Sequence, residues 1–181
     1  PVALGAVTRA RVSANLPKRF DGEFIPEPLE IDARTGSDSP YAVYVSGTHM
    51  AEVEVDTERG AVRVLRVVAA HDVGRAIFPQ GLKGQIDGAV SMGIGLALKE
   101  QFIPGESQGF KDYRIPTTHE STEVEMLLVE LDDPSADLGA KGVAECATVA
   151  VAPAIANAIA DAMGNRVFDL PATPDRVLEL G

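Results

Sequence analysis

A glycine-bearing helical pattern between Gln80 and Glu100 constrains the fold of this chain more than any other segment. Apolar residues recur there at the spacing of one helix face: Leu82, Ile86, Ala89, Val90, Ile94, Ala97 and Leu98. The same segment contains Gly81, Gly84, Gly88, Gly93 and Gly95. Each glycine costs a helix about 1 kcal/mol relative to alanine. A helix tolerates that cost where another backbone or a flat ligand approaches closely, so the pattern predicts a helix whose glycine face is tightly packed.

An alternating segment before this helix predicts a β-hairpin. Ala51, Val53 and Val55 alternate with acidic residues, which is typical of a half-buried strand. Residues 57–60 form a turn that ends in a glycine, and a second apolar strand then runs into the pair His71-Asp72.

The remaining segments complete an α+β pattern. We expect a strand over Val124–Leu131, a helix with Pro153 in its first turn and Gly164 as its C-cap, and a short last helix with Thr173 as its N-cap. The predicted fold class is α+β, with a mixed sheet that includes a β-hairpin and is packed by the glycine-rich helix and a C-terminal helix.

The first forty residues differ in composition from the rest. Prolines, glycines and serines are scattered through this region and interrupt any helical or strand period. We expect residues 1–40 to be an extended lead-in that is poorly structured alone, and residues 41–181 to form the domain portion proper. A loose terminal arm is an equally good interpretation of the lead-in.

Charge and composition exclude several classes of protein. The chain has 16 Lys and Arg against 27 Asp and Glu, a net charge of −11, which argues against a nucleic-acid partner. One cysteine allows neither an internal disulfide nor an iron–sulfur cluster. No stretch reaches about 18 uninterrupted apolar residues, so no transmembrane segment is expected. We expect a cytoplasmic location, and a periplasmic one stays open because the sequence does not begin with Met.

Nucleotide-binding and zinc motifs are not supported. Gly81-Leu82-Lys83-Gly84 lacks the ending of a phosphate-binding loop, and Gly93-Ile94-Gly95 lies inside the predicted helix. The three histidines, His49, His71 and His119, are far apart in the sequence, and no metal ligand is assigned to this chain. For the pair His71-Asp72, a hydrogen-bonded strand end is the favoured interpretation over a polar site.

Glu145 is the carboxylate with the most unusual surroundings. It follows a glycine loop and precedes a seven-residue uncharged run that begins at Cys146. A carboxylate there would be partly desolvated, with a raised pKa that suits a general base, but the local sequence alone favours an ordinary loop glutamate. Cys146 is interpreted as a small packing residue.

Several segments together resemble the C-terminal part of the molybdenum subunit of the xanthine dehydrogenase/aldehyde oxidase family. The resemblance extends from about His49 to Leu180. It rests on these segments in order: His71-Asp72-Val73-Gly74-Arg75, Gly84-Gln85-Ile86-Asp87-Gly88, Gly93 to Leu98, Asp112 to Thr117, Gly139-Ala140-Lys141-Gly142-Val143-Ala144-Glu145, Pro153 to Ile159, and Leu170 to Val177.

The resemblance implies a fragment of a larger, multi-domain molybdenum subunit. Such an enzyme oxidises an N-heterocycle, purine- or nicotinate-like, or an aldehyde, with water as oxygen donor. It uses a molybdenum-pterin cofactor (molybdopterin), with a cytosine dinucleotide form left open. Partner chains or domains would carry 2Fe-2S clusters and FAD, and a small molecule would be the substrate.

The resemblance also assigns site residues. Glu145 matches the family's general base, and Gly84 with Gln85 matches a pair that lies against the pterin. The segment Lys141, Gly142, Val143 and Ala144 leads to the base and is expected to contact the cofactor. An amide such as that of Gln85 is apt there because it both donates and accepts hydrogen bonds.

Three departures from the family pattern favour a second interpretation. Ala144 replaces a glycine, so a positive φ there would cost about 1 kcal/mol or more. Phe78 stands where the family usually has asparagine, and Met92 follows Ser91 where a glutamine often reaches the cofactor. The alternative is therefore a catalytically silent structural module that completes the assembly of such a complex.

Overall fold

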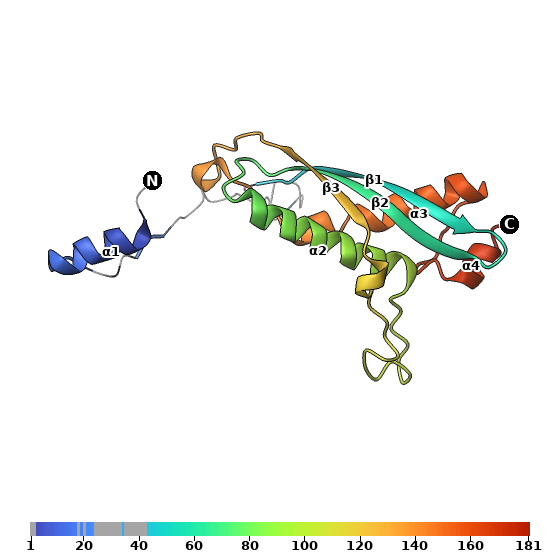
Figure 1. The fold of residues 1–181 in the computed structure, drawn as a ribbon. Helices are drawn as coiled ribbons and strands as arrows, with labels where there is room; N and C mark the ends of the chain where they lie inside the picture. Colours follow the sequence, from blue (N-terminus) through green and yellow to red (C-terminus); the bar gives the residue numbers. More distant parts are fainter. Residues whose placement is uncertain (1–2, 18, 20, 24–33, 35–42) are drawn as a thin grey trace.

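The structure is a computed structural model that describes residues 3–17, 19, 21–23, 34 and 43–181. Three strands and two longer helices form the body of the molecule (Figure 1). In chain order the helices and strands are α1 (Leu4–Ser13), β1 (Gly47–Asp56), β2 (Ala61–Asp72), α2 (Pro79–Leu98), β3 (Glu123–Val129), α3 (Val151–Met163) and α4 (Pro174–Leu178). Three short 3-10 helices lie between them: η1 (Thr118–Glu120), η2 (Asp137–Gly139) and η3 (Glu145–Ala147).

The sheet is mixed, which confirms the predicted α+β class. Its strand order is β1-β2-β3, with β1 antiparallel to β2 and β2 parallel to β3. The chain therefore makes a hairpin, crosses over through α2, and returns to pair β3 with β2. Gly60 closes the hairpin with a φ of +68°, a conformation that glycine adopts without strain.

A β-bulge explains the unbroken apolar run in β2. The register shifts at Glu52 and Val53, which pair with Arg66 and Val64, so that Leu65 is the extra residue. Side chains alternate between the two faces of a sheet, so Val64 and Val67 would point to opposite faces of a regular strand. The extra residue places both of them on the core face. The sequence alternation of β2 is therefore interrupted at Leu65, while one face of the strand stays buried along its length.

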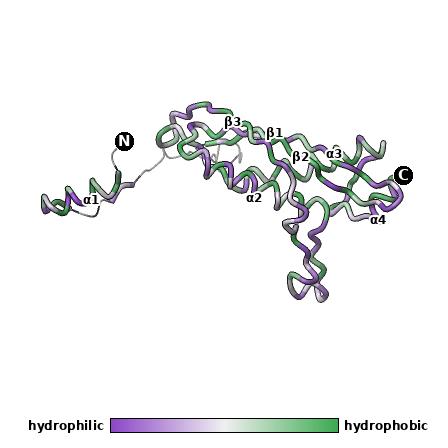
Figure 2. Tube along the Cα trace, in the orientation of Figure 1, coloured by the Kyte–Doolittle hydropathy of each residue, from purple (hydrophilic) through white to green (hydrophobic). Residues whose placement is uncertain are grey.

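Both long helices cover one face of the sheet. Helix α3 packs against β1, α2 lies under β2 and β3, and the two helices contact each other (Figure 1). The fully buried side chains between them include Val67, Ile86, Val90, Ile155 and Ile159. Hydrophobic residues concentrate in these elements, whereas the hairpin turn is hydrophilic (Figure 2).

The part of the opposite face nearer the hairpin turn is cross-linked by charge, whereas toward the ends of β2 and β3 that face exposes Met50, Leu127 and Val129. Arg63 on β2 donates to Glu54 on β1 at 2.7 Å, and Arg66 pairs with Glu125 on β3. The alternation noted in the sequence thus separates a helix-covered core face from an outer face that is charged near the hairpin turn.

The glycines of α2 fall into two groups. A Cβ at Gly93 would lie 2.3 Å from the Cβ of Val151 on α3, and one at Gly95 would meet the Glu100 carboxylate and Pro116. At Gly84 and Gly88 a Cβ would meet nothing within 4 Å. The predicted close packing is confirmed for Gly93 and Gly95, but this chain's own residues do not supply it at Gly84 and Gly88.

The lead-in contains a helix that the sequence did not indicate. Helix α1 occupies Leu4–Ser13, where we expected extended chain, and the chain leaves it at Ala14 and Asn15, before Pro17. The prolines on which the expectation rested begin only at Pro17, so the residues before it are free to be helical. Residues 18, 20, 24–33 and 35–42 lie outside the described residues, and the boundary at residue 40 stays a prediction.

Helix α3 agrees with its prediction in detail. Gly164 adopts a left-handed φ of +77° at its C-cap, and Val151, Ile155 and Ile159 form its buried face. The segment Glu145–Met163 is the one stretch among the described residues that is long and apolar enough to cross a membrane by length and composition. In the fold it comprises η3 and α3, and its buried face packs on the sheet as a core helix does.

Helix α4 begins as expected, with Pro174 in its first turn and Asp175 near its N-terminus. Thr173 is the N-cap residue by position, but its side chain makes no capping hydrogen bond. The predicted N-cap position is therefore confirmed, without a hydrogen bond from the threonine side chain.

Candidate functional site

The candidate site forms where the two parallel strands end. Because β2 and β3 run in the same direction, the loops that follow them leave from one edge of the sheet. The Val73 amide donates to the Val129 carbonyl at 2.9 Å and holds the two exits together. Helix α2 begins a few residues after β2, so its N-terminal half borders the same edge (Figure 1).

Asp72 ties the loops to this edge. Its Oδ1 accepts from the amides of Gly74 at 3.0 Å and Leu131 at 3.4 Å, and its Oδ2 accepts from Lys141 Nζ at 2.6 Å. The side chains of Asp72 and Lys141 are 9% and 11% exposed. The hydrogen bond from Lys141, followed by that from the Gly74 amide, lowers the pKa of Asp72. Asp72 is thus a buried ionic anchor, which agrees with the interpretation of a hydrogen-bonded strand end.

Two of the matched segments are clamped together by their backbones. The Arg75 amide donates to the Gly139 carbonyl at 2.8 Å, and the Lys141 amide donates to the Val73 carbonyl at 2.9 Å. Gly74 has a φ of +58°, and a Cβ there would lie 2.3 Å from the Gly139 oxygen. Conformation and space therefore both require glycine at position 74.

A shallow groove of about 450 Å³ lies between this clamp and the start of α2. It brings together Gln85 and Lys141, two of the predicted site residues, with the exposed side chain of Phe78 at its rim. Its volume lies within the range of small-molecule pockets. The other lining residues are Val73, Arg75, Ile77, Gly81, Leu82 and Ala140.

Glu145 opens η3, a short helix that packs against α2. The side chain is exposed in this chain, so the expected apolar surroundings are not supplied by the described residues. Ala144 before it has a φ of −157°, outside the left-handed region. The cost that a positive φ would impose on alanine at position 144 therefore does not arise.

The predicted cofactor-binding residues differ in whether their polar groups are free to contact a ligand. Among the described residues the Gln85 amide has no hydrogen-bond partner, and the backbone at Gly84 and Gly88 is bare on its outer side. Gly142 and Val143 stand between Lys141 and the base, with Gly142 exposed. By contrast, the ammonium of Lys141 is committed to Asp72. The free amide, the bare helix backbone and the groove fit a flat heterocycle that needs both donors and acceptors.

A histidine pair beside the site, with His71 buried and His49 partly buried, was missed from the sequence. The Nε2 atoms of His49 and His71 are 2.6 Å apart, so one ring donates and the other accepts. Burial and then the charge of His71 lower the pKa of His49 to about 4, and burial lowers that of His71. Strict alternation from the hairpin turn places His49 on the core face but His71 on the outer face, and the bulge at Leu65 moves His71 to the core face, so the pair could not be read from the sequence. No group of three or more His, Cys, Asp or Glu side chains in the described part of the chain is placed to hold a metal ion.

Comparisons with known proteins agree with this arrangement. The profile of the family described as Molybdopterin cofactor-binding domain matches residues 3–122. The molybdenum-binding subunit of an aldehyde oxidoreductase from Escherichia coli (strain K12) is 32% identical over 97% of this chain and 25% of its own length. The gamma subunit of the 6-hydroxypseudooxynicotine dehydrogenase complex from Paenarthrobacter nicotinovorans is 36% identical over 74% of this chain and 18% of its own length.

The solved structures give the same result. The aldehyde oxidoreductase from Desulfovibrio gigas superposes with a TM-score of 0.85 and 32% identity, over 95% of this chain and 19% of that one. The sequence and the fold are thus similar to one part of molybdenum-containing oxidoreductases. The chain belongs to the molybdopterin cofactor-binding domain family of xanthine dehydrogenase and aldehyde oxidoreductase molybdenum subunits. It spans about a fifth to a quarter of the length of these relatives.

Proposed function

We propose that this chain supplies the general base and one wall of the cofactor site to a molybdenum hydroxylase. The substrate would be a small N-heterocycle or an aldehyde, and the inserted oxygen would come from water. The observation that carries the proposal is the Asp72–Lys141 anchor, because it fastens the segment leading to Glu145 beside α2. Such fixed placement is what a base needs in order to meet its substrate at bonding distance.

The molybdenum-pterin cofactor would supply the redox chemistry, accepting two electrons from the substrate carbon. The chain's part is to position and to move a proton. Gln85 would donate to and accept from the heterocycle, while the bare backbone at Gly84 and Gly88 would allow close approach. The backbone of Lys141, Gly142, Val143 and Ala144 would line the approach to Glu145, whose carboxylate would accept the proton released during hydroxylation.

The assembly must provide what this chain lacks. Glu145 is exposed here, so the remaining domains of the subunit would cover it and exclude water. The electrons would leave through 2Fe-2S clusters and FAD on partner chains or domains, since the chain's one cysteine cannot hold a cluster. The relative from P. nicotinovorans is itself described as a subunit of a dehydrogenase complex.

The decisive experiment replaces the proposed base in the assembled enzyme. Glu145→Gln keeps the size and the hydrogen bonds of the side chain but cannot accept a proton. Turnover should fall by about 10²–10⁴-fold or more, with molybdenum content and folding unchanged. Glu58→Gln, in the hairpin turn, is the matched control and should keep full activity. A Glu145→Gln enzyme within a few-fold of the parent would place the base elsewhere.

A silent assembly module is the second candidate. It is favoured by the exposure of Glu145 and by the exposed Phe78 and Met92 at positions where the family usually has polar side chains. Metal analysis of the purified complex separates the two functions. If the complex contains one molybdenum per subunit and Gln85→Leu lowers that content, the chain forms part of the cofactor site. If substitutions in α2 leave the molybdenum content unchanged, the chain is a structural module.

A further inference from the structure

Strand β2 is longer than its partner β3, and half of one edge is left open. The pairing between them begins at Arg66 and Glu123 and runs to Asp72 and Val129. Residues Ala61–Val64 pair with β1 on one side, with Leu65 as the bulge residue, but no strand among the described residues pairs with Ala61–Leu65 on the other side. Such an edge presents unpaired amide and carbonyl groups and is a template for another extended segment.

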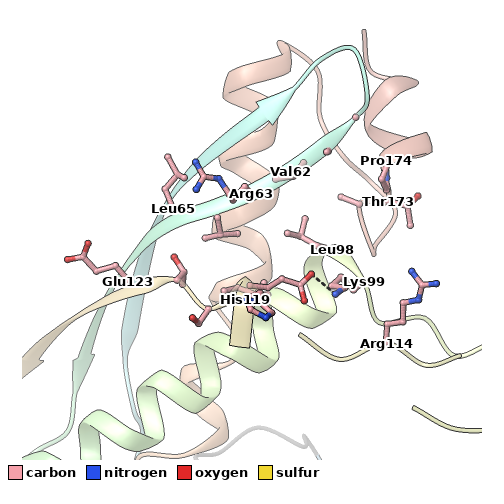
Figure 3. A pocket seen from close by; sticks show the side chains of 18 residues that line it. Val62, Arg63, Leu65, Leu98, Lys99, Arg114, His119, Glu123, Thr173 and Pro174 are labelled. Atoms are coloured by element: carbon pink, nitrogen blue, oxygen red, sulfur yellow. Dashed lines mark hydrogen bonds and ion pairs between the residues drawn. The ribbon is translucent and has the colours of Figure 1, made fainter. Parts of the chain in front are cut away.

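A cavity of about 560 Å³ lies along this open edge. Figure 3 shows it bounded by β2, by the end of α2, by the stretch from Arg114 to Glu123, and by Thr173 and Pro174. Its floor is apolar, because Val64 and Ile94 of the core reach it, together with Leu98 and Ala172. The two-layer core is therefore open on this side, at the place where β3 would continue if it were longer.

The rim of the cavity carries positive groups in an acidic chain. Lys99 bonds to Glu120 at 2.5 Å, and Arg63 bonds to Glu54 at 2.7 Å, so these charges are matched. Arg114, which lines the cavity, has neither an ion-pair nor a hydrogen-bond partner among the described residues (Figure 3). The buried Thr122 hydroxyl also has no partner there. Glu123, on the other side of the cavity, likewise has no ion pair among the described residues, so we expect an occupant that brings an acidic side chain to Arg114 and donors to Glu123.

We propose that this cavity receives an extended segment from the remainder of the molybdenum subunit, which adds a strand beside Ala61–Leu65. In strand addition, the unpaired amide and carbonyl groups of the edge bind the backbone of the added segment. Every second side chain of that segment then enters the cavity. Five strand residues span about 17 Å, which sets the length of the segment. Apolar side chains of the segment cover Val64, Ile94 and Leu98, and an acidic side chain meets Arg114.

The length of the relatives identifies the source of this segment. This chain covers 25% or less of the length of the relatives quoted above, so we assign the segment to the part of such a subunit that lies outside residues 1–181. The inference thus rests on the part of the proposed function that places this chain in a larger subunit. It does not depend on Glu145 or on turnover.

Photo-cross-linking in the assembled subunit tests the occupant. A Ser121→benzoylphenylalanine variant places the probe at the cavity, and Glu52→benzoylphenylalanine on the charged outer face of the sheet is its control. The probe at position 121 should capture a peptide of the same subunit from outside residues 1–181, and the control should not capture that peptide. Capture of residues 1–181, of a second copy or of another subunit would overturn the proposal.

Hydrogen exchange and a charge reversal provide the second measurement. In the assembled subunit, the amides of Ala61–Leu65 that point away from β1 should exchange as slowly as those paired with β3 in Arg66–Asp72. An empty edge would leave them at least about 10²-fold faster, and that result would overturn the proposal even without a cross-linking outcome. Arg114→Glu should raise the exchange of these amides at least about tenfold, whereas Arg114→Lys should not. Loss of turnover in Glu145→Gln with no protection at this edge would refute the docking and leave the proposed function standing.

Discussion

The two halves of α2 use glycine for different purposes. In the C-terminal half, Gly93 and Gly95 are buried, and Gly93 allows α2 to approach Val151 on α3 more closely than any larger residue would permit. In the N-terminal half, Gly84 and Gly88 are exposed, with open space on their outer side. One sequence pattern therefore marks an internal helix contact at one end and an uncovered surface at the other. The uncovered N-terminal half of α2 lies beside the candidate site. A ligand or another domain at that site could therefore contact the helix backbone directly.

The largest loss of stability is expected at the site end, from Lys141→Met. Asp72 would remain buried without its cation, and breaking a buried ion pair in this way typically costs about 3–5 kcal/mol. Denaturant unfolding should show the loss. The double variant Asp72→Asn/Lys141→Met should recover part of it, because no unpaired charge remains. A single variant as stable as the parent would show that the anchor does not hold this end.

At the packed end, Gly93→Leu should lower the free energy of unfolding by about 3 kcal/mol. The new side chain begins 2.3 Å from the Val151 Cβ, and neither helix can move aside without disturbing the core. The matched control is Gly88→Leu, at the exposed position, which should be tolerated by this chain. Equal costs at both positions would remove the distinction between the two halves.

Mild acid should loosen the site end before the packed end. The pKa of His49 falls from 6.5 to about 4 on folding, so the unfolded chain binds more protons between these values and stability decreases as pH drops from about 6.5 toward 4. At the other end, Lys99 lowers the pKa of Glu120 to about 2, so that ion pair is lost only below about pH 4.5. Hydrogen exchange at pH 7 and pH 5, corrected for intrinsic rates, should show increased opening around His49 and His71 but not around Glu120. His49→Leu should reduce the pH dependence, and His119→Leu should leave it unchanged.

The smallest effect is expected from Gly88→Ala. Within this chain the substitution should increase helix stability by up to about 1 kcal/mol, because alanine is the better helix former and no atom obstructs its Cβ. In the assembled enzyme the same methyl group would reduce cofactor content if the pterin lies against this face. Calorimetry of the chain tests the gain in stability, and metal analysis of the complex tests the loss of cofactor.

Most of the fold was predictable because it depends on local patterns. Alternation placed the hairpin, helical spacing placed α2 and α3, and Gly164 marked the end of α3 correctly. Helix α1 was missed because prolines downstream dominated the interpretation. The bulge at Leu65 was missed because one extra apolar residue inside an apolar run gives no visible signal in the sequence.

The site was predictable only in part, since it depends on contacts between distant segments. The sequence singled out Gln85 and Lys141, but nothing local indicated that they line one groove. The bond between Lys141 and Asp72 joins residues that become neighbours only after β3 pairs with β2. The roles of Glu145, Gly84 and Gly142 stay predictions, because they depend on a cofactor and on domains beyond this chain.

The parallel pairing of β2 with β3 also has a consequence for the order of folding. The β1–β2 hairpin closes over a four-residue turn, whereas Arg66 reaches Glu123 only after all of α2 and the long loop behind it have been made. Since distant contacts form more slowly than local ones, the hairpin should form early, and the third strand should dock late. During synthesis the apolar face of the hairpin stays uncovered until α2 and α3 have left the ribosome. That interval is when this chain is most exposed to aggregation and most in need of a chaperone.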